Sequence, residues 1–136
     1  MKKAIFTLVA ALSCLFAVSC TRSDMISISL IGRWELFKVE TTISGERLEP
    51  EYPTQEDRHI FFEFESDDVF VEDIKTPKGL TSFQGSWLVD GDCVIITKTD
   101  GTFRYQVEKA HLTELILFRA YQLEGLSYTE RLTFKK

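Results

Sequence analysis

Two Asp-Gly pairs in the middle of the chain limit its possible folds more than any other feature. They begin at Asp90 and Asp100, inside the segment Phe83–Val107, and each lies between runs in which every second residue is apolar. Asp-Gly between alternating runs is typical of tight β-hairpins, because glycine adopts a positive φ without steric cost. Alternation places the apolar side chains of each run on one face. The segment is therefore predicted to form a three-stranded antiparallel meander with one face that a core must cover.

Alternating runs of the same kind occupy most of the chain on both sides of the meander. They recur about every ten residues with turn residues between them, as in all-β domains. The predicted strands outside the meander are residues 31–41, 59–64, 69–74, 114–122 and 127–135. No long apolar crossover segment of the kind that a parallel sheet requires is present. Eight consecutive antiparallel strands close most simply into an up-and-down barrel, and a two-sheet β-sandwich is the alternative, because the same alternation suits both.

Two predicted connections are longer than hairpin turns. Residues 42–58 are mostly polar and charged, and residues 75–80 contain Pro77 and Gly79. A connection as long as the first is uncommon within a compact domain and often acts as a lid. If the barrel encloses a cavity, we expect that cavity to open beneath residues 42–58.

Strict alternation also indicates which side chains a barrel would enclose. The predicted inward residues that could form a ligand site are Trp34, Phe62, Phe64, Trp87, Phe103, Tyr105, Leu115 and Leu117. An eight-stranded barrel has room for side chains or for one small ligand. These residues could line an apolar cavity, or they could fill the barrel by themselves. Their large volumes slightly favour the filled interior.

Arg119 and Tyr121 continue the phase of Leu115 and Leu117, so alternation directs both toward the interior near one end of the barrel. Guanidinium and phenol donors match the geometry of a carboxylate, so the pair could hold the head group of a ligand. The pair is similar to the Arg-x-Tyr pair of intracellular fatty-acid-binding barrels, although it lies one strand earlier. The commoner alternative is an arginine at the barrel mouth that extends into water.

The first residues have the pattern of a bacterial export signal. Two lysines precede residues 4–18, an apolar stretch as long as a signal-peptide core but too short to span a bilayer comfortably. Ala-Val-Ser before Cys20 resembles a lipobox. The predicted organisation is a signal peptide of residues 1–19, a lipidated Cys20 with a tether in residues 20–29, and a barrel of residues 30–136. The alternative is an ordinary secretory signal cleaved at the same place.

The lipobox resemblance implies a membrane partner. It implies a diacylglycerol on the sulfur of Cys20 and an N-acyl chain such as palmitate. Several acyl chains anchor a protein stably where one chain would not. We therefore expect an outer-membrane lipoprotein that faces the periplasm or the cell surface.

Charge and cysteine content argue against several function classes. The formal net charge is −5, and it becomes −7 when the two lysines of the signal peptide are removed. An acidic surface disfavours phosphate backbones, so no nucleic-acid partner is predicted. Cys93 would be the one cysteine left besides Cys20, so no intrachain disulfide is predicted.

His59 and His111 lack metal-ligand spacing, and no residue pattern suits a nucleophile with its base. We predict no metal, no cofactor and no enzymatic activity.

Gly32-Arg33-Trp34, at the start of the first predicted strand, looks like the Gly-x-Trp signature of lipocalins. The whole run of residues 30–136 resembles the short lipocalin-like domains of bacterial lipoproteins, which are calycin-type β-barrels. The stretches that carry this resemblance are residues 30–36, 85–92, 112–117 and 132–134. The resemblance implies that Trp34 packs at the closed base of the barrel beneath an arginine from near the last strand. Arg131 is the nearest candidate, but its phase places it among the outward residues.

These observations predict a lipid-anchored envelope lipoprotein with an eight-stranded lipocalin-like barrel. The expected function is non-catalytic binding of a small apolar or amphipathic ligand, and this expectation rests on analogy of fold. The alternative is a protein-interaction or envelope-structural module with a filled barrel. Such a module would use its acidic loops or the outward residues Phe37, Phe61 and Phe118.

Overall fold

The computed structural model describes residues 24–136, so the predicted signal peptide and Cys20 lie outside the described residues. Residues 24–30 are helical, and a short 3-10 helix, η1, spans Pro53–Glu56. The strands are β1 (Gly32–Ile43), β2 (Glu46–Arg47), β3 (His59–Phe64), β4 (Val69–Thr76), β5 (Gly79–Asp90), β6 (Cys93–Lys98), β7 (Gly101–Ala110), β8 (Glu114–Leu123) and β9 (Leu126–Lys135).

Strands β1 and β3 to β9 form a closed antiparallel barrel. Each strand pairs with the next along the chain, and β1 also pairs with β9, which closes the barrel. The two-residue strand β2 adds a short ribbon to the end of β1. All eight predicted strands are present, so the barrel prediction is confirmed and the sandwich alternative is wrong. The Asp-Gly pairs form the β5–β6 and β6–β7 turns, as predicted.

The predicted connection of residues 75–80 is wrong, because most of it belongs to strands. β4 continues to Thr76 and β5 begins at Gly79, so only Pro77 and Lys78 make the turn. Gly79 has φ +133°, a conformation that side chains other than glycine rarely adopt. Proline and glycine therefore mark a tight hairpin here and not a loop.

A β-bulge in β1 changes the face on which its later residues lie. The pairing with β9 passes from Leu36 directly to Lys38, which leaves Phe37 as the extra residue. Val39 consequently packs against the core, although period-two alternation assigns it to the opposite face from Trp34. Phe37 stays on the outside, 40% exposed.

The helix of residues 24–30 closes one end of the barrel, which we call the base. Its Leu30 is fully buried and its Ile26 packs against the core. The indole Nε1 of Trp34 donates a hydrogen bond to the Leu30 carbonyl oxygen at 2.9 Å. Lys136 Nζ lies 4.5 Å from the Trp34 ring centroid. The described part of the predicted tether is therefore a helix packed on the barrel.

Lys136, and not an arginine, takes the position above Trp34 that the lipocalin resemblance implied. Arg131 points outward, as its phase predicted, and its Nε donates to Glu108 Oε1 at 2.6 Å. Gly32 leaves room for Lys136, because a Cβ at this position would lie 2.7 Å from Lys136 Nζ. An ammonium over an indole face is a favourable cation–π contact.

Glu114, at the β7–β8 turn, links two neighbouring strands at the base. Its carboxylate accepts hydrogen bonds from Lys109 Nζ at 2.7 Å and from Lys135 Nζ at 2.6 Å. These two hydrogen bonds, with the charges of both ammonium groups, lower the pKa of Glu114 from 4.5 to about 2.

We expect Glu114 to make stability depend on pH in the acid range. A lowered folded-state pKa contributes stability that is fully present above the unfolded value of 4.5 and is lost as the pH falls through about 2. The difference in unfolding free energy between wild type and Glu114→Gln should therefore shrink from pH 6 to pH 2. Urea unfolding across this range measures it. A difference in unfolding free energy that stays constant with pH would contradict the prediction. As a control, the same comparison in a protein that carries both Lys109→Met and Lys135→Met should show no pH dependence.

The half of the barrel next to the base is filled with side chains. Its buried residues are Leu30, Trp34, Leu36, Phe62, Phe64, Phe70, Trp87, Val94, Ile96, Tyr105, Leu115, Leu117, Leu132 and Phe134. Aromatic rings contact one another throughout this core, and the Phe62 centroid lies 4.8 Å from that of Phe134 and 5.1 Å from that of Phe70. Aromatic side chains bury large apolar areas, so this core contributes much of the hydrophobic stabilisation of the barrel.

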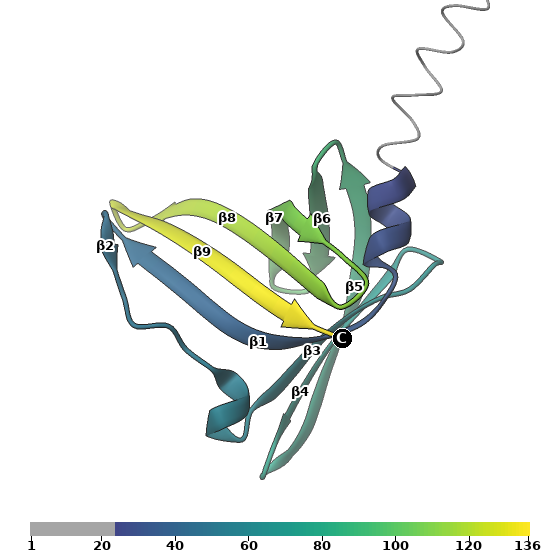
Figure 1. The fold of residues 1–136 in the computed structure, drawn as a ribbon, viewed down its shortest axis with the longest axis horizontal. Helices are drawn as coiled ribbons and strands as arrows, with labels where there is room; N and C mark the ends of the chain where they lie inside the picture. The colour runs from purple at the N-terminus through teal and green to yellow at the C-terminus, as the bar shows by residue number, and fades with distance from the viewer. Residues whose placement is uncertain (1–23) are drawn as a thin grey trace, which may run out of the picture.

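The other end of the barrel, which we call the mouth, flares because neighbouring strands part there. β1 pairs with β3 only as far as Glu35, whereas its pairing with β9 on the other edge continues to Ile43. β7 pairs with β8 only from Gln106 onward, and β5 pairs with β6 only from Ser86 onward. Figure 1 shows the result, with β8, β9 and β1 extending to one side and the β4–β5 hairpin to another.

The connection between β2 and β3 lies against β1 where β3 has left it. Glu51 and Val39 exchange two backbone hydrogen bonds of 2.9 Å, and the Tyr52 ring meets Phe37 edge-on at 5.8 Å. Pro53 is buried. This segment therefore fills part of the gap between β1 and β3 at the mouth.

Candidate functional site

Seven of the ten predicted ligand-site residues belong to the packed core. None of them has more than 6% of its surface exposed, and they are Trp34, Phe62, Phe64, Trp87, Tyr105, Leu115 and Leu117. Their rings pack against each other, for example Phe64 against Trp87 at 5.3 Å. A ligand among them would have to displace side chains from a close-packed interior, which is costly. Their role in binding a ligand stays a prediction.

The other three predicted residues, Phe103, Arg119 and Tyr121, lie together at the mouth and are half-buried. The Arg119 guanidinium carbon is 4.3 Å from the Tyr121 ring centroid and 5.2 Å from that of Phe103. It also lies 5.6 Å from the ring of Tyr105 at the edge of the core. Arg119 occupies the place where β7 and β8 part, so its side chain fills the space between the two strands.

Three inward charged residues that the sequence analysis did not select complete this cluster. Lys98 Nζ donates to Glu72 Oε1 at 3.0 Å and lies 4.8 Å from the Phe103 ring, so Phe103 has a cation near it from each side. Glu130 Oε1 is 3.7 Å from Arg119 Nε. We call the residues Glu72, Lys98, Phe103, Arg119, Tyr121 and Glu130 the mouth cluster.

Alternation did contain the signal for the missed residues. Glu72 follows Phe70, Lys98 follows Ile96 and Glu130 precedes Leu132, each two positions from a core residue. Glu72 lies in an acidic stretch of the sequence, residues 63–73, which is typical of a solvated turn. Its side chain is nevertheless only 15% exposed and is paired with Lys98. A polar residue two positions from a core residue indicates an inward side chain as clearly as an apolar residue does.

The mouth cluster contains two cationic and two anionic side chains that are largely buried. Burial raises the pKa of Tyr105 to about 12, so its phenol remains neutral at physiological pH. Arg119 Nε is buried and has no hydrogen-bond partner among the described residues. A buried donor without a partner is costly, and an acceptor from a ligand would satisfy it. Glu130 offers charge, but 3.7 Å is too long for a hydrogen bond.

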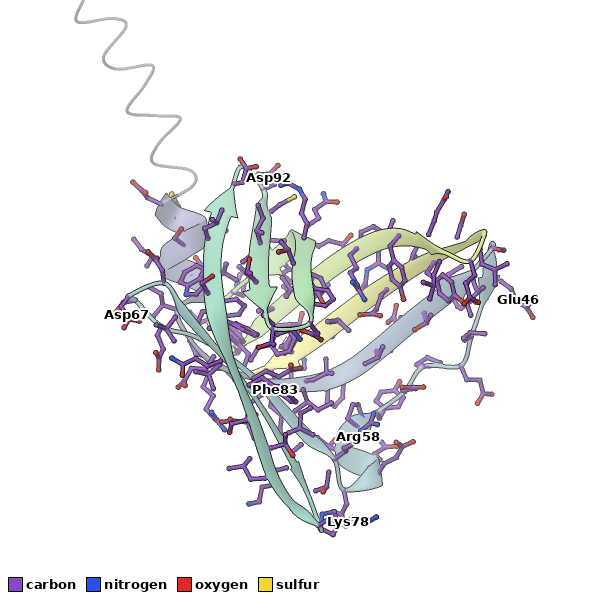
Figure 2. The ribbon with its side chains drawn as sticks, turned by 180° about the vertical axis from the view of Figure 1, so that it is seen from behind. Glu46, Arg58, Asp67, Lys78, Phe83 and Asp92 are labelled. Atoms are coloured by element: carbon purple, nitrogen blue, oxygen red, sulfur yellow. The ribbon has the colours of Figure 1, made fainter. Side chains whose placement is uncertain are left out.

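An open hollow of about 300 Å³ adjoins the mouth cluster. It is lined by Glu72, Ile74, Phe83, Lys98 and Asp100. Phe83 is 45% exposed and lies part-way along the free section of β5 (Figure 2). Larger hollows of about 380 and 320 Å³ lie at the base beside the helix of residues 24–30. The mouth thus combines paired charges, aromatic rings and open space, whereas no Phe, Tyr or Trp lines either of these base hollows.

Groups capable of other chemistry are dispersed over the described part of the chain. Within it, no cluster of three or more His, Cys, Asp or Glu is arranged to hold a metal ion. His59 Nδ1 lies 2.7 Å from Glu35 Oε2 on the outside of the barrel, and Cys93 is a half-buried free thiol. Among residues 24–136, no helix has both the length and the apolar character needed to cross a bilayer.

Comparison with known proteins establishes the fold. The sequence matches no protein-family model and no curated protein. The structure is similar to a lipocalin-like protein from Bacteroides uniformis, with a TM-score of 0.58 and 20% identity over 79% of this chain and 98% of that chain. An uncharacterized protein from Bacteroides eggerthii gives a TM-score of 0.50 and 17% identity over 76% and 98% of the two chains.

The similarity extends to an animal protein. Lobster apocrustacyanin A1 gives a TM-score of 0.51 and 14% identity, and the match covers 79% of this chain and 61% of that chain. Identities this low show a shared fold and leave function to be argued from the site. Residues 24–136 therefore have the fold of a lipocalin-like β-barrel.

Proposed function

We propose that this protein is a lipid-anchored envelope protein whose barrel binds a small amphipathic molecule at its mouth, without catalysis. The observation that carries the proposal is Arg119, whose Nε has no hydrogen-bond partner within residues 24–136 and whose guanidinium lies among three aromatic rings. Guanidinium groups bind carboxylates with two parallel hydrogen bonds. The ligand is therefore a molecule with an anionic head and an apolar body.

The distribution of space in the barrel supports a ligand at the mouth and not in the core. The apolar body can lie against Phe83 and Ile74 in the open hollow, while the head group meets Arg119 and Lys98. Glu130 and Glu72 balance these two cations and would compete with a ligand carboxylate. We therefore expect modest affinity, with the apolar body contributing a large share of it.

The protein-interaction alternative has less support, because cations or rings already contact the outward aromatic residues. Arg33 lies 4.2 Å from the Phe61 ring, and Arg131 lies 5.1 Å from the Phe118 ring. Phe37 contacts Tyr52. These residues therefore form no contiguous bare patch of the size that marks a protein interface.

Arg119→Met should weaken binding of decanoate about tenfold and change binding of decanol much less. The reason is that a charge-assisted hydrogen bond to a carboxylate contributes about 1.5–3 kcal/mol, and competition from Glu130 keeps the loss near the lower end of this range. Titration calorimetry of both ligands with residues 20–136 measures the effect. The control is Arg104→Met, because Arg104 is exposed on β7 and pairs with Asp90. Equal losses for the two ligands, or wild-type protein that binds neither, would sink the proposal of an anion site.

The anchor is tested separately by acylation in cells. We expect the full chain produced in a Gram-negative host to incorporate labelled palmitate and to fractionate with the outer membrane. Cys20→Ser should lose the label, whereas Cys14→Ser and Cys93→Ser should keep it. Label that persists in Cys20→Ser, or a wild-type chain without label, would refute lipidation at Cys20.

A further inference from the structure

Four apolar side chains are exposed together at the base of the barrel. Met25, Ile28 and Ile31 come from the N-terminal helix and the residue after it, and Leu112 comes from the β7–β8 turn. Their exposed fractions are 63%, 70%, 38% and 88% in this order. Ile28, Ile31 and Leu112 line one shallow hollow of about 320 Å³, which shows that they are neighbours. We call these four residues the base patch.

The base patch lies at the end of the barrel from which the chain continues toward Cys20. The described residues begin at Asp24, four positions after Cys20. Four residues span at most roughly 14 Å when fully extended. An acylated Cys20 would therefore hold the base close to the bilayer surface, with the mouth at the opposite end.

We propose that the base patch enters the interfacial region of the bilayer that holds the acyl chains of Cys20. The proposal rests on the lipidation proposed above. Membrane contact would remove from water the most exposed leucine of the described chain, Leu112, together with Ile28 and Met25. It would also fix the orientation of the barrel, so that the mouth cluster faces away from the membrane and remains open to soluble ligands.

Apolar side chains are exposed at the mouth as well, and geometry distinguishes the two ends. Leu80 is 63% exposed on the β4–β5 hairpin, and Leu123 is 56% exposed on the β8–β9 hairpin. These hairpins splay apart in Figure 1, so their leucines do not form one flat patch. They also point away from the end at which the tether begins.

The charges around the base patch indicate which lipids it suits. Asp67 and Asp92 lie on turns to either side of the N-terminal helix (Figure 2). Lys109 and Lys135 at this end are already paired with Glu114, and Lys136, which lines the hollow of the base patch, lies over the Trp34 ring. The base is therefore not a cationic surface, and attraction to anionic lipids would not drive the contact. Apolar insertion into a zwitterionic interface fits these charges better.

The test couples the chain to vesicles chemically, so that it does not depend on acylation in cells. A chain of residues 20–136 includes every residue that the structure describes, so it retains all the contacts given above. In a Cys93→Ser background, the thiol of Cys20 is joined to a maleimide lipid in phosphatidylcholine vesicles. A Leu112→Trp variant reports insertion through quenching by brominated acyl chains. Trp34 and Trp87 are at most 5% exposed and give the same background in every variant.

We expect Leu112→Trp fluorescence to shift to the blue and to be quenched at least threefold more than that of the matched control Leu80→Trp. Ile28→Trp should behave like Leu112→Trp, which covers the case in which one variant misfolds. Phosphatidylglycerol vesicles should give no more quenching than phosphatidylcholine. Equal quenching at the base and the mouth, or greater quenching of Leu80→Trp, would overturn the proposal.

Two further outcomes distinguish membrane contact by the base patch from a dimer interface and from the lipidation of Cys20. If uncoupled residues 20–136 sediment as a dimer that Leu112→Ser dissociates, the base patch is an interface between copies and the membrane proposal fails. If quenching is as expected but labelled palmitate is absent from the chain made in cells, the base patch stands as an interfacial surface and the lipidation proposal fails.

Discussion

Gly85→Ala should destabilise the barrel by about 3 kcal/mol or more, because two backbones approach each other too closely at this position for any Cβ. A Cβ built on Gly85 would lie 3.1 Å from the carbonyl carbon of Thr97 and in outright overlap with its oxygen. The obstacle is main chain, so no side-chain rotation relieves it. The pairing of β5 with β6 begins at the next residue, Ser86, which pairs with Thr97, so relief would break the ladder at its first pair.

Two control variants separate the steric effect from other losses. Gly45→Ala places a Cβ where no atom lies within 4 Å but where φ is +86°, so it measures backbone strain alone, about 1 kcal/mol. Gln84→Ala changes an exposed neighbour and should alter stability by less than about 0.5 kcal/mol. Urea unfolding followed by tryptophan fluorescence compares the three variants. A loss for Gly85→Ala no greater than that for Gly45→Ala would show that the strands can move apart without cost.

Trp34→Ala should cost about 3–5 kcal/mol, which is a large part of the 5–15 kcal/mol typical of a domain. Trp34 is fully buried, and its removal would leave a cavity beneath the helix of residues 24–30. The variant would also lose the hydrogen bond to Leu30 and the contact with Lys136. Trp34→Phe keeps a ring in place but loses the donor, so a loss of about 2 kcal/mol is expected.

Hydrogen exchange adds a readout that locates the effect of these Trp34 variants. The backbone amides of residues 24–30 should lose protection from exchange first, since the hydrogen bond from Trp34 to Leu30 holds this helix to the base. Phe37→Ala, at an outward position that is 40% exposed, is the control and should cost clearly less. A Trp34→Ala protein within about 1 kcal/mol of wild type would mean that the base tolerates a cavity and that other contacts hold the helix.

The two halves of the barrel differ in composition and in the expected effect of substitutions. The half at the base contains the buried aromatic core, so substitutions there act on stability. The half at the mouth contains paired charges and open space, so substitutions there should act on binding with smaller effects on stability. This division explains why a filled core and a ligand site are compatible in one small barrel. The base patch, for which membrane contact is proposed, and the proposed ligand site lie at opposite ends of the barrel.

Several features of this protein could be predicted from its sequence because they depend on adjacent residues. The Asp-Gly turns at Asp90 and Asp100 form as expected, since turn chemistry acts over four residues. Period-two alternation correctly placed Trp87, Tyr105 and Leu115 in the core. The inward direction of Arg119 was predicted in the same way, because it keeps the phase of Leu117 through an uninterrupted strand.

Other features were decided only by the closure of the barrel. The bulge at Phe37 lies in the pairing of β1 with β9, just beyond the point at which β1 loses β3 from its other edge, and it reverses the face of Val39. Local alternation cannot indicate such a change. The pairing of Lys98 with Glu72 joins strands that are far apart in the sequence, so no short pattern reveals it.

The parting of β7 from β8 is likewise decided by closure, because these two ten-residue strands pair only at the base and then follow β6 and β9, their other neighbours. It creates the space that Arg119 fills, and with it the candidate site. The strands, their turns and the direction of most side chains were therefore predictable, because they follow from contacts between neighbouring residues. Which strands separate at the mouth, and which charges meet there, depends instead on contacts that form only when the barrel closes.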